Sequence, residues 1–295
     1  MKKVYYGGQA VIEGVMMRGK DKIAIAVRKS SEDIAVEEMT LKSVSDKLPF
    51  LKWPFIRGVV NLFSSLFIGM KALNYSANQA LEEEEEELGP LEMIFSIVLA
   101  FGLAILLFVV LPAGIISFIQ HYINSNVILN LMEGLIKVLA FLGYLFSISR
   151  FKDIQRVFQY HGAEHKVIYN YEAKKPLSVE NAREKSTLHP RCGTNFLFIV
   201  ILLSIFFFSF FGRPPFLQRV LYHILLLPVI AGTSYEVIKL AGKERVNPLI
   251  KLLATPGLWL QKLTTSEPDD SMLEVAIKAL KGVLPEEEEG GRSDE

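Results

Sequence analysis

Apolar stretches long enough to cross a membrane dominate the middle of the chain. Four of them, at about residues 91–119, 127–149, 194–212 and 219–241, contain few charged residues. Because an α-helix rises 1.5 Å per residue, each stretch is long enough to cross a hydrocarbon core of about 30 Å. The pattern predicts a mainly α-helical, polytopic membrane protein with about four transmembrane helices.

The first 90 residues have a different pattern. Glycines and short apolar runs separated by polar residues predict a small β-rich element with at least one hairpin over residues 1–47. In residues 48–90, Lys52 and Arg57 interrupt an apolar stretch, which favours an interfacial or re-entrant helix over a full span. The run Glu82–Glu87 then predicts an acidic linker.

The last segment, residues 242–295, is expected to return to the membrane surface. Its apolar residues and Trp259 predict a second interfacial segment. Asp269 then offers an N-cap to an amphipathic helix in which Leu273 and Ile277 share one face. The acidic tail is expected to be disordered.

Basic residues orient the predicted spans. The loop HYINSN has no Lys or Arg, whereas residues 150–195 contain nine and the first 90 residues contain twelve. The positive-inside rule therefore places both termini and residues 150–195 on the cytoplasmic side. Two arginines between the third and fourth spans oppose this orientation. The predicted units are 1–47, 48–90, 91–149 with two spans, the loop 150–195, 196–241 with two spans, and 242–295.

Composition supports the membrane class without naming a ligand. Residues of hydrophobic type make up 51% of the chain, and the 32 basic residues balance the 32 acidic ones. We therefore expect the lipid bilayer as a partner and no nucleic acid, while a homo-oligomer remains open. The single cysteine, Cys192, excludes an internal disulfide and leaves a thiol available to a metal.

The sharpest chemical signal is the H-x-x-E-H spacing of His161, Glu164 and His165, which is the pattern of the inverted zinc metallopeptidases. Positions i and i+4 of a helix lie on one face about 6 Å apart, so both imidazoles can face one ion while Glu164 reaches a neighbouring water. The alternative is a hydrogen-bonded, structural histidine pair.

Further candidate ligands lie on the same predicted side of the membrane. His189 and Cys192 have an H-x-x-C spacing in a Pro/Gly turn. Together with His161 and His165 they are four of the six His and Cys residues of the chain, which predicts a divalent metal site, with zinc as the expected ion. Glu236, near the cytoplasmic end of the fourth span, is a further candidate ligand; its alternative is an interfacial ion pair with a nearby lysine.

Two other pairs carry weaker signals. Glu13 and Arg18 lie among glycines in GGQAVIEGVMMRG, where a tight turn is favoured over a catalytic loop. Glu133 and Lys137 are an i and i+4 pair inside the second span, and we expect them to neutralise each other.

The motifs GGQAVIEGVMMRG, YHGAEHK, HPRCGTNF, GTSYE and PGLWLQ, found along nearly the whole chain, resemble those of the YqhQ-like family of bacterial membrane proteins, a domain-of-unknown-function family. The resemblance implies a multi-pass protein of the cell inner membrane and raises metal dependence as an expectation. It implies motif positions at Glu13, Arg18, His161, Glu164, His165, His189, Cys192 and Glu236. It names no substrate.

The leading functional hypothesis is a metal-dependent hydrolase that activates water at zinc, with Glu164 as general base. The interfacial segments suit a membrane-embedded substrate, either a lipid or a peptide. The first alternative is a non-catalytic scaffold, in which His161, His165, His189 and Cys192 close a structural metal site. The second is a transporter, which has weaker support because no internal repeat is visible.

Overall fold

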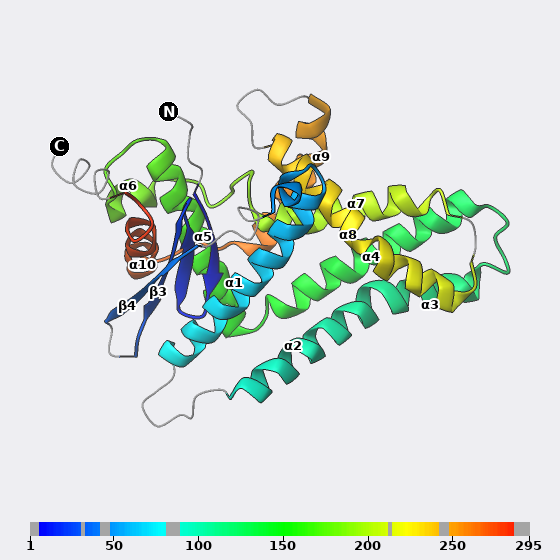
Figure 1. Cartoon of the computed structure of the whole chain (residues 1–295), viewed down its shortest axis with the longest axis horizontal. Helices are drawn as coiled ribbons and strands as arrows, with labels where there is room; N and C mark the ends of the chain where they lie inside the picture. The colour runs from blue at the N-terminus through cyan, green and yellow to red at the C-terminus, as the bar shows by residue number, and fades with distance from the viewer. Residues whose placement is uncertain are drawn as a thin grey trace.

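The computed structural model describes residues 6–30, 33–41, 48–80, 89–211, 214–241 and 248–285. The predicted acidic linker, Glu82–Glu87, and the predicted disordered tail after residue 285 lie outside these residues. A small sheet with its covering helices lies at one end of the structure, and a bundle of long apolar helices extends from it (Figure 1).

The sheet has four antiparallel strands in sequence order. They are β1 (Gly7–Val11), β2 (Gly14–Arg18), β3 (Lys22–Arg28) and β4 (Ile34–Thr40). A two-residue turn joins β1 to β2, and Glu13 adopts a left-handed conformation there, with φ of 48°. The predicted β-rich element with a hairpin is therefore confirmed.

Both faces of this sheet are covered, so it needs apolar residues on each. On one face, Val15, Met17 and Ala24 pack against α5 (Lys152–Glu172) and α10 (Asp270–Lys281). On the other, Met16 and Ile25 pack against α1 (Ile56–Ala80). Successive strand residues point to opposite faces, and fully burying a Met or Ile side chain contributes about 1.5 to 3 kcal/mol.

Helix α10 confirms the predicted amphipathic helix. The Asp269 side chain accepts a hydrogen bond of 3.0 Å from the Met272 backbone N–H, which caps the first turn. Leu273, Ile277 and Leu280 are buried on the face that contacts the sheet. A short helix, α6 (Val179–Arg183), packs against α10, and a 3₁₀ turn at Pro49–Lys52 precedes α1.

The apolar bundle contains a long helix made of α2 (Pro90–Ile105), a π-helical turn (Leu106–Val110) and α3 (Leu111–Ile119). It is followed by α4 (Asn126–Ile148), α7 (Gly193–Phe208), α8 (Phe216–Ala241) and α9 (Pro248–Thr264). Many large apolar side chains on α2, α4 and α8 are exposed, as in helices that face lipid.

Among the described residues, four helices are long and apolar enough to cross a membrane, and they are Ile56–Ala80, Ile94–Ile119, Asn126–Ile148 and Phe216–Leu240. The predicted number of long apolar helices is confirmed, but the four helices are not the four that the sequence predicted. The predicted span at 194–212 forms only the 16-residue helix α7, about 24 Å long, so it is shorter than predicted. Helix α1 has the required length, yet its contacts with β1 and β3 align part of it with the sheet.

Charged residues inside the bundle pair with one another. Lys137 Nζ lies 3.0 Å from Glu133 Oε1, and Arg219 also pairs with Glu133. All three side chains are buried, which makes mutual pairing necessary because an isolated charge inside apolar surroundings is costly. The structure therefore pairs Glu133 with Lys137, as predicted, and adds Arg219 to the pair.

Candidate functional site

Helix α5 brings His161, Glu164 and His165 to one face, as the spacing predicts. The two imidazole centroids lie 4.4 Å apart. Gly162, between them, allows the chain after α9 to approach closely, since a Cβ at this position would lie 2.1 Å from the Ser266 carbonyl oxygen. This close approach brings the Thr264 carbonyl against the first histidine.

Backbone carbonyls fix the orientation of both histidines. His161 Nδ1 lies 2.8 Å from the Thr264 carbonyl oxygen, and His165 Nδ1 bonds the Thr187 carbonyl oxygen. A carbonyl oxygen can only accept, so each Nδ1 carries the hydrogen and donates it. In a neutral imidazole with this tautomer, Nε2 has the lone pair, which is the arrangement that orients metal-binding histidines.

Cys192 completes a compact cluster with the two histidines. It lies at the N-terminus of α7, and its Sγ is 3.1 Å from His161 Nε2. One nitrogen of each histidine and the Cys192 sulfur all lie within 4.8 Å of one another. Histidine nitrogen and cysteine sulfur are the atom types that bind zinc in proteins, so this cluster is a candidate metal-binding group.

The thiol hydrogen of Cys192 also fits this interpretation. Where His161 Nε2 has the lone pair, the thiol is the donor in the 3.1 Å contact. Burial lowers the pKa of His165, although a hydrogen bond with Cys192 opposes this effect. A metal ion bound by such residues would require a cysteine thiolate and neutral histidines, so binding would release the thiol proton.

Glu164 lies beside the cluster rather than in it. Its Oε2 is 3.5 Å from His165 Nε2, and its side chain is only 6% exposed. Burial raises the pKa of Glu164, while His161, His189 and a hydrogen bond with the Gly8 backbone partly oppose the rise. A buried carboxyl with a raised pKa next to candidate ligands has the properties of a general acid or base.

His189 has other partners. Its Nδ1 accepts a 3.3 Å hydrogen bond from the Arg191 backbone N–H, and its Nε2 lies 3.6 Å from Glu172 Oε2. Burial on its own raises the pKa of Glu172, but hydrogen bonds from His189 and Arg191 outweigh it and lower this pKa to about 2. Both ring nitrogens of His189 are thus engaged outside the cluster.

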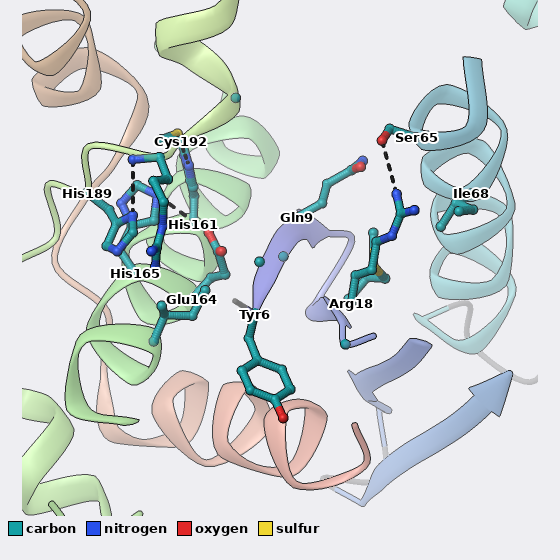
Figure 2. Close-up of a pocket in the computed structure, with 17 residues that line it drawn as sticks. Tyr6, Gln9, Arg18, Ser65, Ile68, His161, Glu164, His165, His189 and Cys192 are labelled. Carbon is teal, nitrogen blue, oxygen red and sulfur yellow. Dashed lines mark hydrogen bonds and ion pairs between the residues drawn. The ribbon is translucent and has the colours of Figure 1, made fainter. Parts of the chain in front are cut away.

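A cavity of about 390 Å³ opens in front of the cluster. Figure 2 shows His161, His165 and Cys192 on one side and Arg18 with Ser65 on the other, with β1 between them. Gly7 and Gly8 line the cavity between these sides. The candidate ligands are therefore open to a space large enough for a small ligand or part of a larger one.

The remaining sequence-predicted residues separate into two groups. Arg18 lines the cavity, although the motif alone favoured a tight turn. Glu13 instead forms an ion pair with Arg156 and accepts a hydrogen bond of 3.4 Å from the Tyr160 hydroxyl, which ties the β1–β2 turn to α5. Glu236 does not line the cavity; it accepts a 2.7 Å hydrogen bond from Arg57 Nε, and this pair joins α8 to α1.

A family profile described as "Protein of unknown function (DUF1385)" matches residues 53–286, which include α5, α7 and the whole cluster. The chain belongs to this family. The chain is also similar to "Uncharacterized protein YqhQ" of Bacillus subtilis (strain 168), with 38% identity over 293 residues that cover 95% of this chain and 92% of the relative. No solved structure matches.

Sequence patterns did not predict several residues at the site of this DUF1385 member. Glu172 and Arg191 hold His189, and the carbonyls of Thr187 and Thr264 orient the two histidines of α5. No side-chain pattern can reveal a carbonyl acceptor. Arg191 lies inside the H-x-x-C segment, so its position in the sequence could have indicated that it belongs to the site.

Proposed function

We propose that this protein is a metal-dependent membrane enzyme, and that it hydrolyses a membrane-embedded substrate. His161, His165 and Cys192 are the proposed ligands of a divalent ion, with zinc as the expected one. Histidine nitrogen and cysteine sulfur are both ligand atoms of protein zinc sites, and catalytic sites use three protein ligands and keep a further position for water or substrate. The three converging donor atoms next to an open cavity are the observation that carries this proposal.

A bound divalent ion would lower the pKa of water and polarise the bond to be cleaved. Glu164 then accepts a proton from the attacking water and delivers it to the leaving group. In the overall reaction one water adds across an ester or amide bond, and the products are an acid and an alcohol or amine. The burial of Glu164, and the raised pKa that results, suit a group that must carry a proton in one part of this cycle.

The surroundings of the cavity support a membrane substrate. Ser65 and Ile68 of α1 line it together with Cys192 and Gly193, which begin the apolar helix α7. We propose a multi-pass protein of the cell inner membrane with both termini and the α5–α7 segment in the cytoplasm, in keeping with the distribution of basic residues. The site would then lie at the cytoplasmic surface of the membrane.

A metal-stapled scaffold is the second candidate, because the cluster joins α5 to α7 across 31 residues. A closed structural metal site needs a fourth ligand, and His189 is the residue predicted for that role. Its ring nitrogens instead contact Glu172 and the Arg191 backbone N–H, which counts against it as a ligand. Among the described residues, no fourth His, Cys, Asp or Glu joins the candidate metal group. This open arrangement favours the enzyme over the scaffold.

The two candidates differ in the role of Glu164. In the enzyme, Glu164→Gln retains the metal and the fold but loses the cellular function in a deletion strain, since losing a general base costs about 10²- to 10⁴-fold in rate. In the scaffold, Glu164→Gln restores function fully. His189→Ala is the contrast, because a ligand of a structural site is required for stability. Full function of Glu164→Gln together with unfolding and metal loss in His189→Ala would overturn the enzyme.

A further inference from the structure

We propose that the side of the cavity opposite the cluster binds the phosphate group of an anionic membrane phospholipid, with Arg18 as its main contact. This inference rests on the proposed function, because it names the substrate class of the same site. Arg18 ends β2, and its Nη1 donates a 3.3 Å hydrogen bond to Ser65 Oγ of α1 (Figure 2). The side chain therefore spans from the sheet to α1 at the edge of the cavity.

Arg18 is the basic group of the cavity that remains available to an anion. Arg191 also lines the cavity, but it forms an ion pair with Glu172. Among the residues that the structure describes, no carboxylate lies within ion-pair distance of Arg18, and its side chain donates a hydrogen bond to the neutral Ser65 hydroxyl. A planar guanidinium with free donors matches the oxygens of a phosphate.

The neighbouring surface of α1 identifies the phosphate as part of a lipid. A second, mainly apolar cavity of about 660 Å³ lies along α1, and Ile68 lines both cavities. Phe63 and Phe67, which line the second cavity, are 63% and 68% exposed. Such aromatic exposure suits contact with acyl chains at a membrane surface.

The two cavities together match the two parts of a phospholipid. The polar cavity has the cluster on one side and Arg18 on the other, and Gln9 adds an amide to its lining. The apolar cavity beside α1 receives an acyl chain. A phosphopeptide or free phosphate shares the contact with Arg18, but neither has a tail for the apolar cavity.

Binding of a fluorescent short-chain phosphatidylglycerol to the purified full-length protein tests this inference by fluorescence anisotropy. Arg18→Gln is expected to weaken the Kd at least about tenfold, because a hydrogen bond to a charged group is removed. Ser65→Asp, which neutralises Arg18 without removing it, is expected to have the same effect. Lys20→Gln is the matched control, since Lys20 is an exposed cation on the neighbouring turn and pairs with Asp21.

Competitors separate the possible sources of the phosphate. Unlabelled phosphatidylglycerol displaces the probe, whereas diacylglycerol of the same chain length, which lacks the phosphate, requires at least about tenfold more. If inorganic phosphate or a phosphotyrosine peptide displaces the probe as effectively as the lipid does, the lipid assignment is overturned. An unchanged Kd in both Arg18→Gln and Ser65→Asp would overturn the role of Arg18.

Metal content measured on the same preparations keeps this inference separable from the proposed function. Arg18→Gln retains the metal, because Arg18 is not among the cluster atoms. Loss of lipid affinity together with retained metal supports the headgroup site. Retained lipid affinity in both Arg18→Gln and Ser65→Asp, with metal still bound, overturns the headgroup site and leaves the metal-dependent enzyme intact. Metal that stays bound when both cluster histidines are replaced overturns the proposed function instead.

Discussion

His161 Nε2 lies 3.1 Å from Cys192 Sγ, although 31 residues separate them in the chain. The first comes from the middle of α5 and the second from the start of α7. Gln261 of α9 holds the connecting turn in place, because its amide bonds both the backbone N–H and the carbonyl of His189. The contact therefore depends on three helices, and changes around it are expected to alter the site.

Gly8 packs directly against this site. A Cβ at Gly8 would lie 2.7 Å from the Met16 carbonyl oxygen and 2.8 Å from Glu164 Cγ, so β1 or α5 must shift. Gly8→Ala is expected to destabilise the protein by about 1 to 3 kcal/mol, the usual cost of overpacking. Thermal unfolding measured by intrinsic fluorescence checks this, with a lower Tm expected.

Gly7→Ala is the matched control for this change. Of the residues that the structure describes, none has an atom within 4 Å of a Cβ at Gly7, so the Tm of this variant should stay close to that of the unmodified chain. Equal Tm values for the two alanine variants would contradict the close packing of β1 on Glu164.

Glu172 predicts a pH-dependent contribution to stability. Its pKa is about 2 in the folded protein, against 4.5 for an ordinary glutamate. A lowered carboxyl pKa stabilises the fold fully above pH 4.5, and this stabilisation is lost as pH falls from 4.5 towards 2. Glu172→Gln is therefore expected to lower the Tm by several degrees at pH 7, and the difference from the unmodified chain should shrink below pH 4.5.

Glu184→Gln provides the comparison for Glu172. The Glu184 side chain is 70% exposed in its pair with Lys175, so its removal should change the Tm little at any pH. A Tm difference for Glu172→Gln that stays constant from pH 7 to pH 3 would show that the carboxylate is not held by His189 and Arg191.

Local sequence patterns predicted the helices and strands better than the tertiary contacts between them. The i, i+3 and i+4 positions of His161, Glu164 and His165 follow from helical periodicity alone, and so does the buried face of α10. The position of Arg18 depends on the packing of the sheet against α1, which no local pattern encodes. Glu236 was expected near the cluster from its depth in the membrane, but Arg57 of α1 pairs with it instead.

The length of α7 shows a second limit of prediction from sequence. Apolar composition predicted a span over 194–212, whereas the helix covers Gly193–Phe208. Composition reports which residues avoid water, but it does not distinguish lipid from a protein neighbour. Helix α7 packs on α4, α8 and α9, and α1 packs on the sheet and α8, so tertiary contacts decide which apolar helices need to face lipid.

The proposed topology predicts opposite accessibility for two exposed positions. Asn124→Cys, in the loop between α3 and α4, is expected to react with a membrane-impermeant maleimide in intact cells. Glu184→Cys, next to the cluster segment, should react only after permeabilisation. Background labelling is expected to be low because Cys192 is buried. Labelling of Glu184→Cys in intact cells would contradict a cytoplasmic site.

The metal content of the purified protein tests the central claim most directly. Elemental analysis is expected to find about one zinc or another transition metal ion per chain, lost in the His161→Ala/His165→Ala double variant because two of three ligands are removed. His121→Ala, at an exposed histidine outside the cluster, and Glu236→Gln should retain the metal. Metal content unchanged by the double variant would contradict the proposed centre.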